Sequence, residues 1–377
     1  MNRRRFLTVL GVTGAGTAAM SGCSTGRVEK LIPYLVQSED QVPGTPTWYA
    51  STCTECPAGC GLHVKTREGR AIKLEGNPDH PLNAGALCAM GQAGLQGLYN
   101  PGRVKGPMVR QGGTLQAAAW DDAIGRLAAQ IGAAQGRIAV ISGAGPGTFD
   151  DLLAEWTAAA GGRLVRWQPF GREPERLANR RIFGRDELAH HDFAAAHHIV
   201  SFGADFLETW GSVVEQQRGF AVSHGFDGRS MAKLVYVGPR MSLTGLNADE
   251  WHATRPGSEA ALALAMAQVI LSERTSAPED ASGLRGALAA FTPERAATET
   301  GLAVETVRRL AREFVSGNPS LAVAGGAGAQ HAGAAELCAA VNVLNYVAGN
   351  VGRTVRFGLG LPRTDGHQAM QELIAAM

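Results

Sequence analysis

Four cysteines with a distinctive spacing constrain this chain more than any other feature of its sequence. Three lie close together as Cys53-Thr-Glu-Cys56-Pro-Ala-Gly-Cys60, and Cys88 follows after the intervening residues 61–87. A [4Fe–4S] cluster needs four thiolates, which a tight loop of three cysteines and a more distant fourth can supply. The spacing therefore predicts that Cys53, Cys56, Cys60 and Cys88 bind one [4Fe–4S] cluster.

Three other uses of the same cysteines stay open. A structural zinc site more often uses two C-x2-C pairs, which the lone Cys88 does not complete. Two disulfides are a second alternative, although Cys53 and Cys56 are too close in sequence to pair comfortably with separate partners. The third alternative is a motif that holds no metal.

The N-terminus carries an export pattern. Arg3-Arg4-Arg5-Phe6-Leu7 matches a twin-arginine signal, and Met20-Ser21-Gly22-Cys23 looks like a lipobox, in which Cys23 is lipidated and the chain is cut before it. We expect residues 1–23 to be this signal and residues 24–48 to be an extended arm. Because this route exports folded proteins, a reduced metal site can form before the chain meets an oxidising compartment. The predicted location is the periplasmic side of the cytoplasmic membrane, with a lipid anchor.

The charge and the apolar pattern give no signal for nucleic-acid binding or for a membrane-spanning segment. The net charge is +1 with acids and bases interspersed, so the sequence offers no basic face for nucleic acid. Beyond residue 25, no apolar run reaches the roughly 20 residues that span a bilayer. The apolar fraction of 45% is sufficient for a substantial core.

Residues 49–105 form the expected small cysteine-bearing domain. Within it, 61–66 and 70–75 alternate polar and apolar residues around the turn Glu68-Gly69, which predicts a β-hairpin.

Residues 106–377 alternate strands with helices. This pattern predicts an α/β fold whose small hairpin domain is followed by a doubly wound, mostly parallel sheet. Trp120, Ile124, Leu127 and Ile131 share one helical face, and Thr148 begins a pattern like a capping box. We expect strands at 137–142, 163–167, 198–202, 233–237 and 321–324, and further helices near 174–188, 257–272, 303–315, 333–348 and 367–377. The last helix has no strand after it, so the sequence looks C-terminally truncated.

The cysteine module resembles a known domain. The run from Tyr49 through Cys60-Gly-Leu-His-Val-Lys-Thr-Arg-Glu-Gly-Arg to Glu75-Gly-Asn-Pro-Asp-His-Pro81 is similar to the N-terminal iron–sulfur domain of the molybdopterin oxidoreductases. Gly85-Ala-Leu-Cys88 and Leu98-Tyr-Asn-Pro-Gly-Arg103 continue the likeness. The resemblance implies an oxidoreductase family and a cluster on these cysteines.

A later stretch resembles the pterin-dinucleotide segment of the same family. It runs from Val237-Gly-Pro239-Arg240 to Arg255-Pro-Gly257-Ser-Glu259-Ala-Ala-Leu262. The resemblance implies that Pro239, Arg240, Gly257 and Glu259 are vestigial contacts to such a cofactor. Gly325-Gly-Ala-Gly328 and Asn345 to Arg353 are similar to a further helix-and-glycine passage.

Within the family, the twin-arginine start, the arm and the cysteine module look most like the large iron–sulfur subunit of alternative complex III. This branch implies a membrane-associated, quinol-oxidising complex. Its implied partners are a membrane quinol-binding subunit, a ferredoxin-like iron–sulfur module and c-type haem subunits.

Several positions depart from the catalytic members. Met90 stands where they usually have Lys or Arg, Gly238 where they have Asp, and Glu259 where they have Asp. No cysteine lies between Cys88 and Cys338 to hold molybdenum, and nothing singles out Asp205 or Ser212 for that role. We therefore expect bis-molybdopterin guanine dinucleotide to be absent and the chain to have no catalytic centre of its own.

Other motifs give weaker signals. The turn Gly143-Ala-Gly145-Pro-Gly147 misplaces the third glycine of a dinucleotide-binding loop, so we interpret it as a scaffold turn. The pairs His190-His191 and His197-His198 are interpreted as surface or helix-end histidines, and Cys338 as a small core residue.

The sequence therefore predicts an iron–sulfur subunit of a quinol-oxidising membrane complex, without molybdenum. One alternative is the N-terminal half of a true molybdopterin-dependent reductase of the polysulfide or nitrate type. A second alternative is a structural scaffold without any cofactor.

Overall fold

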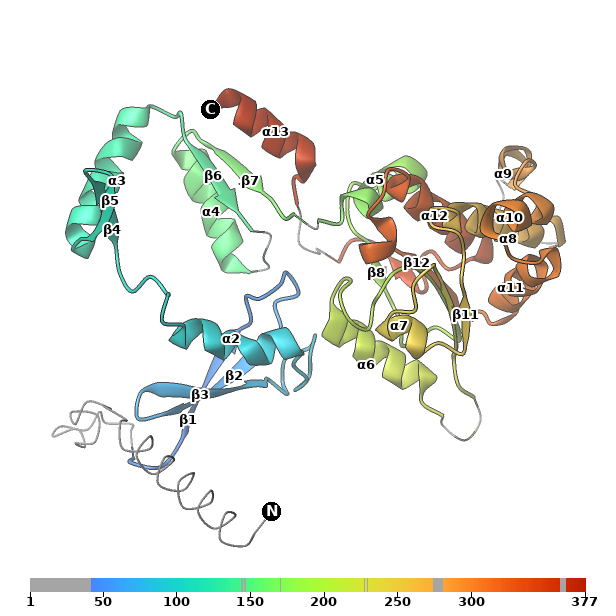
Figure 1. Ribbon diagram of the computed structural model, residues 1–377, viewed down its shortest axis with the longest axis horizontal. Helices are drawn as coiled ribbons and strands as arrows, with labels where there is room; N and C mark the ends of the chain where they lie inside the picture. The colour runs from blue at the N-terminus through green and yellow to red at the C-terminus, as the bar shows by residue number, and fades with distance from the viewer. Residues whose placement is uncertain are drawn as a thin grey trace, which may run out of the picture. The chain divides into compact units, whose positions relative to one another are not determined.

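The computed structural model describes residues 42–143, 145, 147–169, 171–226, 228, 230–273, 281–359 and 364–377 (Figure 1). The twin-arginine signal, Cys23 and most of the arm at 24–48 lie outside the described residues. The chain divides into a small unit of residues 1–47 with 66–70 and a large unit that contains the rest.

The described residues of the small unit are 42–47 and the hairpin tip 66–70, and hydrogen bonds connect these two segments. The Arg67 guanidinium donates to the Gly44 carbonyl at 2.9 Å, and the Gly44 N–H donates to the Glu68 carboxylate at 3.2 Å. Glu68 and Gly69 both have positive φ, at 50° and 74°, as a two-residue hairpin turn requires.

The cysteine-bearing domain is a three-stranded sheet with one helix. The strand order is β1-β2-β3, and the hairpin predicted from 61–66 and 70–75 is confirmed as β2 and β3. The elements are β1 (Thr47–Thr52), β2 (Gly61–Arg67), β3 (Arg70–Gly76) and α2 (Ala89–Tyr99).

The next segment contains a second hairpin and a short parallel sheet. The β4–β5 hairpin was not expected from the sequence, whereas the strands and helices after it were. Thr148 is not the N-cap of α4, because the helix begins at Thr148 itself and Gly147 precedes it. The elements are β4 (Met108–Gln111), β5 (Thr114–Ala117), α3 (Trp120–Ala134), β6 (Ala139–Ser142), α4 (Thr148–Ala159) and β7 (Arg163–Arg166).

The largest sheet has four parallel strands in the order β11-β10-β9-β12. The predicted strands at 198–202 and 233–237 are confirmed at these residues, and β9 pairs in register with both β10 and β12. The elements from here are α5 (Glu173–Phe183), β8 (His190–His191), β9 (His198–Phe202), α6 (Val213–His224), β10 (Lys233–Val237), α7 (Leu243–Leu246), β11 (Glu250–His252), α8 (Glu259–Glu273), α9 (Ala281–Leu288), α10 (Pro293–Thr300), α11 (Val304–Ser316), β12 (Ser320–Ala324), the 3-10 helix η2 (Gly326–Ala329), α12 (Ala334–Ala348), β13 (Val355–Arg356) and α13 (Gly366–Ala376).

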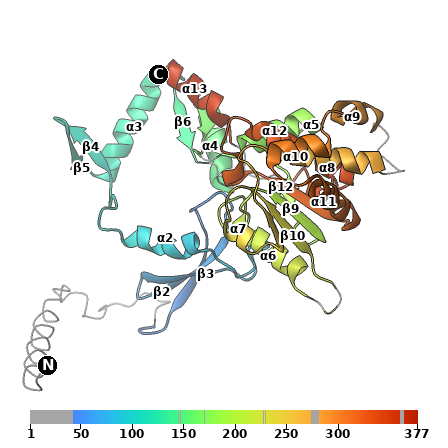
Figure 2. The ribbon, with the colours of Figure 1, turned by 45° about the vertical axis from the view of Figure 1, so that its right-hand side comes forward.

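Alternate residues of this sheet enter two different cores. Val200 and Val235 pack into a cluster with α8, α11 and α12, whereas Ile199 and Leu234 pack into a second cluster on the opposite face. Figure 2 shows α8, α10, α11 and α12 on one side of the sheet and α6 with α7 on the other. A parallel sheet covered on both faces confirms the doubly wound α/β prediction.

Two histidine predictions were wrong. His198 is 3% exposed and begins the central strand β9, and burial lowers its pKa to about 4. His191 lies in β8, and its pKa is lowered to about 3 by burial and by the nearby Arg172. Both imidazoles are therefore neutral parts of the fold. Cys338 is confirmed as a core residue of α12. Within the described residues, no helix is both long and apolar enough to cross a membrane.

A group of charged side chains connects β10, β11 and α11. Glu250 accepts from Lys233 at 2.5 Å, Arg309 at 2.7 Å and His252 at 3.0 Å. Lys233 and Arg309 also contact Glu313 at 2.8 and 2.9 Å. The hydrogen bonds from Arg309 are the largest cause that holds the pKa of Glu250 well below its ordinary value.

Because the pKa of Glu250 is depressed in the folded state, its contribution to stability is present at neutral pH and is lost as pH falls through the folded-state pKa. Glu250→Gln should lower the free energy of unfolding at pH 7 by about 1–3 kcal/mol. This deficit should shrink as the pH is lowered toward 3. Urea unfolding at several pH values measures it. Glu305→Gln is the control, because Glu305 is 80% exposed, and it should change stability by no more than about 0.5 kcal/mol. An equal Glu250 deficit at every pH would contradict the assignment.

Candidate metal centre

The cysteine-bearing domain folds so that its two loops meet. Cys53 directly follows β1 and Cys60 directly precedes β2, and the Cys53 N–H donates to the Cys60 carbonyl at 2.8 Å. Cys88 lies at the N-cap of α2. Cys53 and Cys60 are 7% and 4% exposed, whereas Cys56 and Cys88 are only half-buried. The site therefore has a buried side and a side nearer to solvent.

The four thiols lie in one electrostatic neighbourhood. Burial, and to a smaller extent the nearby thiols of Cys56, Cys53 and Cys88 in that order, raise the pKa of Cys60 to about 11. Burial also raises the pKa of Cys53, and Cys56 and Cys88 add to this. All the described cysteines are free thiols. The structure thus brings together the four residues that the sequence singled out.

This donor set fits a [4Fe–4S] cluster. In a cubane each thiolate meets a different iron, so the four sulfurs surround a volume and do not converge on one point. Among the described residues, no three His, Cys, Asp or Glu side chains converge closely enough to hold a single metal ion. Bound iron would hold the Cys53 and Cys60 sulfurs, whose pKa values are raised, as thiolates and would release their protons.

Asn83 is a positioning residue that the sequence analysis missed. It is fully buried, and its amide connects the loop after Cys60 with the loop before Cys88. Its Oδ1 accepts from the Gly61 N–H at 2.9 Å, and its Nδ2 donates to the carbonyls of Gly61 at 3.0 Å and Ala86 at 2.7 Å. Asparagine is common in loops, so its type and position gave no signal that this one joins two ligand loops.

The close packing of the first loop also depends on Gly61. A Cβ atom at this position would lie 2.6 Å from the His80 side chain. Glycine is therefore required where the strand that follows Cys60 passes the loop leading to Cys88.

A doubly wound sheet binds ligands outside the carboxyl ends of its strands, and here that edge is occupied by internal contacts. Asp205, three residues after β9, is fully buried. It accepts from the Tyr236 hydroxyl at 2.8 Å and forms an ion pair with Arg240. Arg240 also lies 3.8 Å from Glu208. The single positive charge of Arg240 is thus balanced by two carboxylates.

Trp210 closes the next part of this edge. Its indole N–H donates to Glu175 at 2.8 Å, and Glu175 forms an ion pair with Arg172, which lies over the Trp210 ring at 4.8 Å. A Cβ at Gly325, directly after β12, would lie 2.2 Å from the indole nitrogen. The Trp210 indole therefore packs directly against the backbone at Gly325 and leaves no room for a side chain there.

The remaining predicted site residues are dispersed. Pro239 and Gly257 are exposed, and Gly257 has a φ of 82°. Glu259 is 5% exposed and accepts from the Thr254 hydroxyl at 3.2 Å. Ser212 directly precedes α6. Met90, in the first turn of α2, is 55% exposed.

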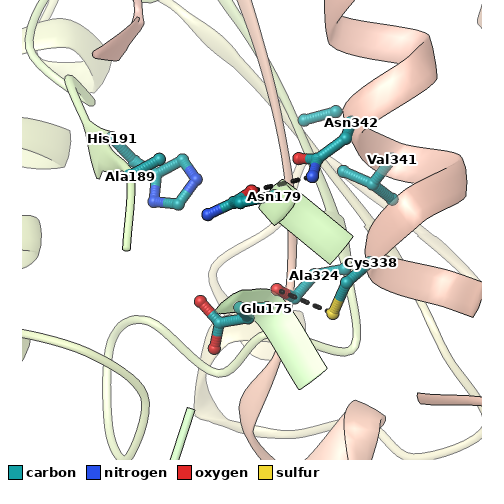
Figure 3. A pocket seen from close by; sticks show the side chains of 9 residues that line it. Glu175, Asn179, Ala189, His191, Ala324, Cys338, Val341 and Asn342 are labelled. Carbon is teal, nitrogen blue, oxygen red and sulfur yellow. Dashed lines mark hydrogen bonds between the residues drawn. The ribbon is translucent and has the colours of Figure 1, made fainter. Parts of the chain in front are cut away.

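Two cavities accompany these contacts. One of about 20 Å³, large enough for one water, is lined by Glu175, Asn179, His191, Cys338 and neighbours. Figure 3 shows the hydrogen bond from Asn342 to Asn179, of 2.8 Å, within it.

The second cavity, of about 280 Å³, lies between the end of β7 and the starts of α5 and α13. Its lining includes Trp167, Glu173 and His367, and among the described lining residues there is neither lysine nor arginine.

Two family models match this chain. The molybdopterin oxidoreductase Fe4S4 domain matches residues 46–100, and the molybdopterin oxidoreductase model matches residues 103–361. The chain belongs to the molybdopterin oxidoreductase family. The resemblance noted in the sequence, and the oxidoreductase class that it implied, are therefore confirmed.

Curated relatives share moderate identity over most of the chain. The molybdopterin-binding-like subunit of menaquinone reductase from Nitratidesulfovibrio vulgaris is 30% identical, over 94% of this chain and 52% of that protein. The molybdopterin-containing subunit of thiosulfate reductase from Salmonella typhimurium is 26% identical, over 86% of this chain and 43% of that protein. The chain spans about half the length of these family members.

A solved structure supports the fold. Acetylene hydratase from Pelobacter acetylenicus superposes with a TM-score of 0.63 at 17% identity, covering 84% of this chain and 44% of that chain. At this identity the likeness establishes the α/β architecture.

Asn83→Ala should loosen the candidate metal centre. Removing the amide takes away the acceptor of the buried Gly61 N–H and the donor to the Ala86 carbonyl, which costs about 1–3 kcal/mol. We expect the urea midpoint of the cysteine-bearing domain to fall and the four thiols to react faster with a maleimide. Asn247→Ala is the control, because Asn247 is exposed and water can replace its hydrogen bond to the Leu243 carbonyl. Equal behaviour of the two variants would contradict the role of Asn83.

Proposed function

We propose that this chain is an iron–sulfur, molybdopterin-oxidoreductase-like subunit of a membrane-associated, quinol-oxidising complex of the alternative complex III type, and that it works without molybdenum. The observation that carries the proposal is the contrast between its two candidate cofactor sites. Four free thiols share one neighbourhood in the Fe4S4 domain, whereas the carboxyl edge of the large sheet is occupied by internal ion pairs.

Cys53, Cys56, Cys60 and Cys88 would hold the cluster, which transfers one electron at a time when bound. Cys53 and Cys60 pack with Leu62 and the partly buried Leu87, so this side excludes water. Asn83 holds the two ligand loops together. The half-buried Cys56 and Cys88 face the side where an electron partner can approach.

The proposed lack of a pterin dinucleotide rests on charge. Such a cofactor brings a pyrophosphate, which favours cations and free backbone N–H groups. Arg240 is instead paired with Asp205 and lies near Glu208, and Arg172 is paired with Glu175. The carboxylates that neutralise these arginines would repel a phosphate at the same place.

The proposed setting of the subunit is the periplasmic side of the cytoplasmic membrane. It follows from the twin-arginine pattern and from Cys23 as a lipid attachment site. A membrane quinol-binding subunit, a ferredoxin-like iron–sulfur module and c-type haem subunits are the proposed partners. The name of the Nitratidesulfovibrio relative, a menaquinone reductase subunit, supports a quinone-linked complex.

That name also favours a second candidate function. A complex that reduces menaquinone would use the same cluster in the opposite direction of electron flow. The reduction potential of the cluster, measured and compared with the potentials of menaquinone and of the periplasmic electron acceptor, distinguishes the two directions of electron flow.

Metal analysis of the purified protein tests the proposal against its alternatives. We expect about four irons per chain, a cluster EPR signal after reduction, and neither molybdenum nor pterin fluorescence. Cys56→Ala should remove the signal and most of the iron, because it deletes one of the four proposed ligands. Cys56 is one of the two that lie on the more exposed side of the site. Cys338→Ala is the matched control, because Cys338 lies in the α12 core and should leave the iron content unchanged.

Each other result selects a different function. Stoichiometric molybdenum with pterin would identify the N-terminal half of a molybdopterin-dependent reductase. Neither metal would identify a scaffold subunit. Unchanged iron in Cys56→Ala would overturn the ligand assignment.

A further inference from the structure

Helix α6 packs against the candidate metal centre. Near the start of the helix, Val214 is 5% exposed and belongs to the same apolar cluster as two of the proposed ligands, Cys53 and Cys60. One turn later, the Arg218 guanidinium donates to the Leu82 carbonyl at 3.0 Å. The first half of α6 therefore contacts both the buried pair of cysteines and the loop that leads to the fourth ligand.

The next residue of this helix, Glu215, pairs with His190 of β8. Nε2 of His190 lies 2.9 Å from Oε1 of Glu215, and the two side chains are 23% and 34% exposed. Consecutive Cα atoms are about 3.8 Å apart, so Glu215 stays beside the apolar cluster that contains Val214. Partly buried charges are screened less by salt than exposed ones are. A change of charge at the metal centre therefore acts on this pair.

The hydrogen bond of the pair identifies the atom that can gain a proton. The hydrogen bond to His190 lowers the pKa of Glu215, so the carboxylate is ionised and can only accept. In the neutral imidazole, Nε2–H is then the donor and Nδ1 is the basic atom. Nδ1 is buried and has no hydrogen-bond partner among the described residues. The imidazole therefore keeps one nitrogen open for a proton.

The charged groups that face His190 come from α6, from β13 and from the residue after β8. The hydrogen bond to Glu215 is the largest cause that raises the pKa of His190, and burial opposes it. The negative charges of Glu215 and Asp192 raise it further. Arg356 of β13 lowers it and is itself paired with Asp192 at 2.9 Å. Arg218 acts on the Glu215 carboxylate.

The other histidines nearby differ in their surroundings. His191, the next residue of β8, is neutral, because burial, with the nearby Arg172, lowers its pKa to about 3. His80 lies in the loop that leads to Cys88, and its side chain packs against Gly61. His190 is thus the imidazole near this side of the centre that has an ionised carboxylate as its partner.

We propose that the His190–Glu215 pair takes up one proton when the [4Fe–4S] cluster accepts one electron. This inference rests on the cluster of the proposed function. The electron comes from the quinol-oxidising partner, and one solvent proton adds to Nδ1 of His190, with no other bond formed or broken. The imidazolium then offsets part of the negative charge that the electron brings to the centre.

The reduction potential of the cluster should therefore depend on pH. Because reduction raises the proton affinity of His190, the potential should fall as the pH rises through a window above 6.5, the ordinary pKa of this side chain. The fall should be up to tenfold in the equilibrium constant per pH unit, or about 59 mV for one electron. EPR-monitored redox titration of the iron-loaded protein at several pH values measures it.

His190→Gln should remove this pH dependence. The glutamine amide can still donate to the Glu215 carboxylate, but it does not titrate. His197→Gln is the matched control, because His197 is exposed at the start of β9 and should leave the pH dependence unchanged. A potential that is independent of pH in a protein with its cluster intact would reject this inference alone. A protein without a cluster would overturn the proposed function as well.

Glu215→Gln keeps the test valid if His190→Gln does not fold. Removing the carboxylate lowers the pKa of His190, so the window in which the potential falls should move to lower pH. An unchanged window would contradict the proposal. His80→Gln tests the competing imidazole, and loss of the pH dependence in this variant, with the dependence retained in His190→Gln, would also overturn the proposal.

Discussion

The candidate metal centre depends on four thiols that lie together and are partly shielded from water. Burial and the neighbouring thiols raise the pKa of Cys60 to about 11, so without a bound metal ion this sulfur is protonated at neutral pH. The folded loops must therefore be held by other contacts before iron can replace the protons. The Cys53–Cys60 backbone hydrogen bond and the three bonds of Asn83 provide this, because they close each loop without using a thiol.

Buried groups at the carboxyl edge of the large sheet likewise depend on partners from the same chain. Its carboxyl edge contains buried Asp205 and Glu175, which need a cation or a donor nearby. Arg240, Arg172, Tyr236 and Trp210 meet that need from within the chain. At the edge where other doubly wound proteins bind their ligands, these buried carboxylates are thus paired by groups of the same chain.

Local patterns predicted the elements well, and long-range contacts were not predictable. The spacing of Cys53 to Cys88 and the apolar runs of β9 and β10 identified a cysteine-bearing domain and a parallel sheet, because these signals depend on neighbouring residues. The role of Asn83 could not be predicted, since it depends on two loops that meet only in the fold. His198 was misjudged for a similar reason, because histidine composition does not reveal that β9 pairs on both edges. The helical face of α3 was correctly identified, but its exposure could not be foreseen.

The uneven burial of the four cysteines affects the chemical durability of the site. An oxidant that diffuses in from solvent reaches Cys56 and Cys88 before it reaches Cys53 and Cys60, which are 7% and 4% exposed. Sulfenic acid formation would thus start at Cys56 and Cys88, on the more exposed side of the centre, while the buried Cys53 and Cys60 remain reduced.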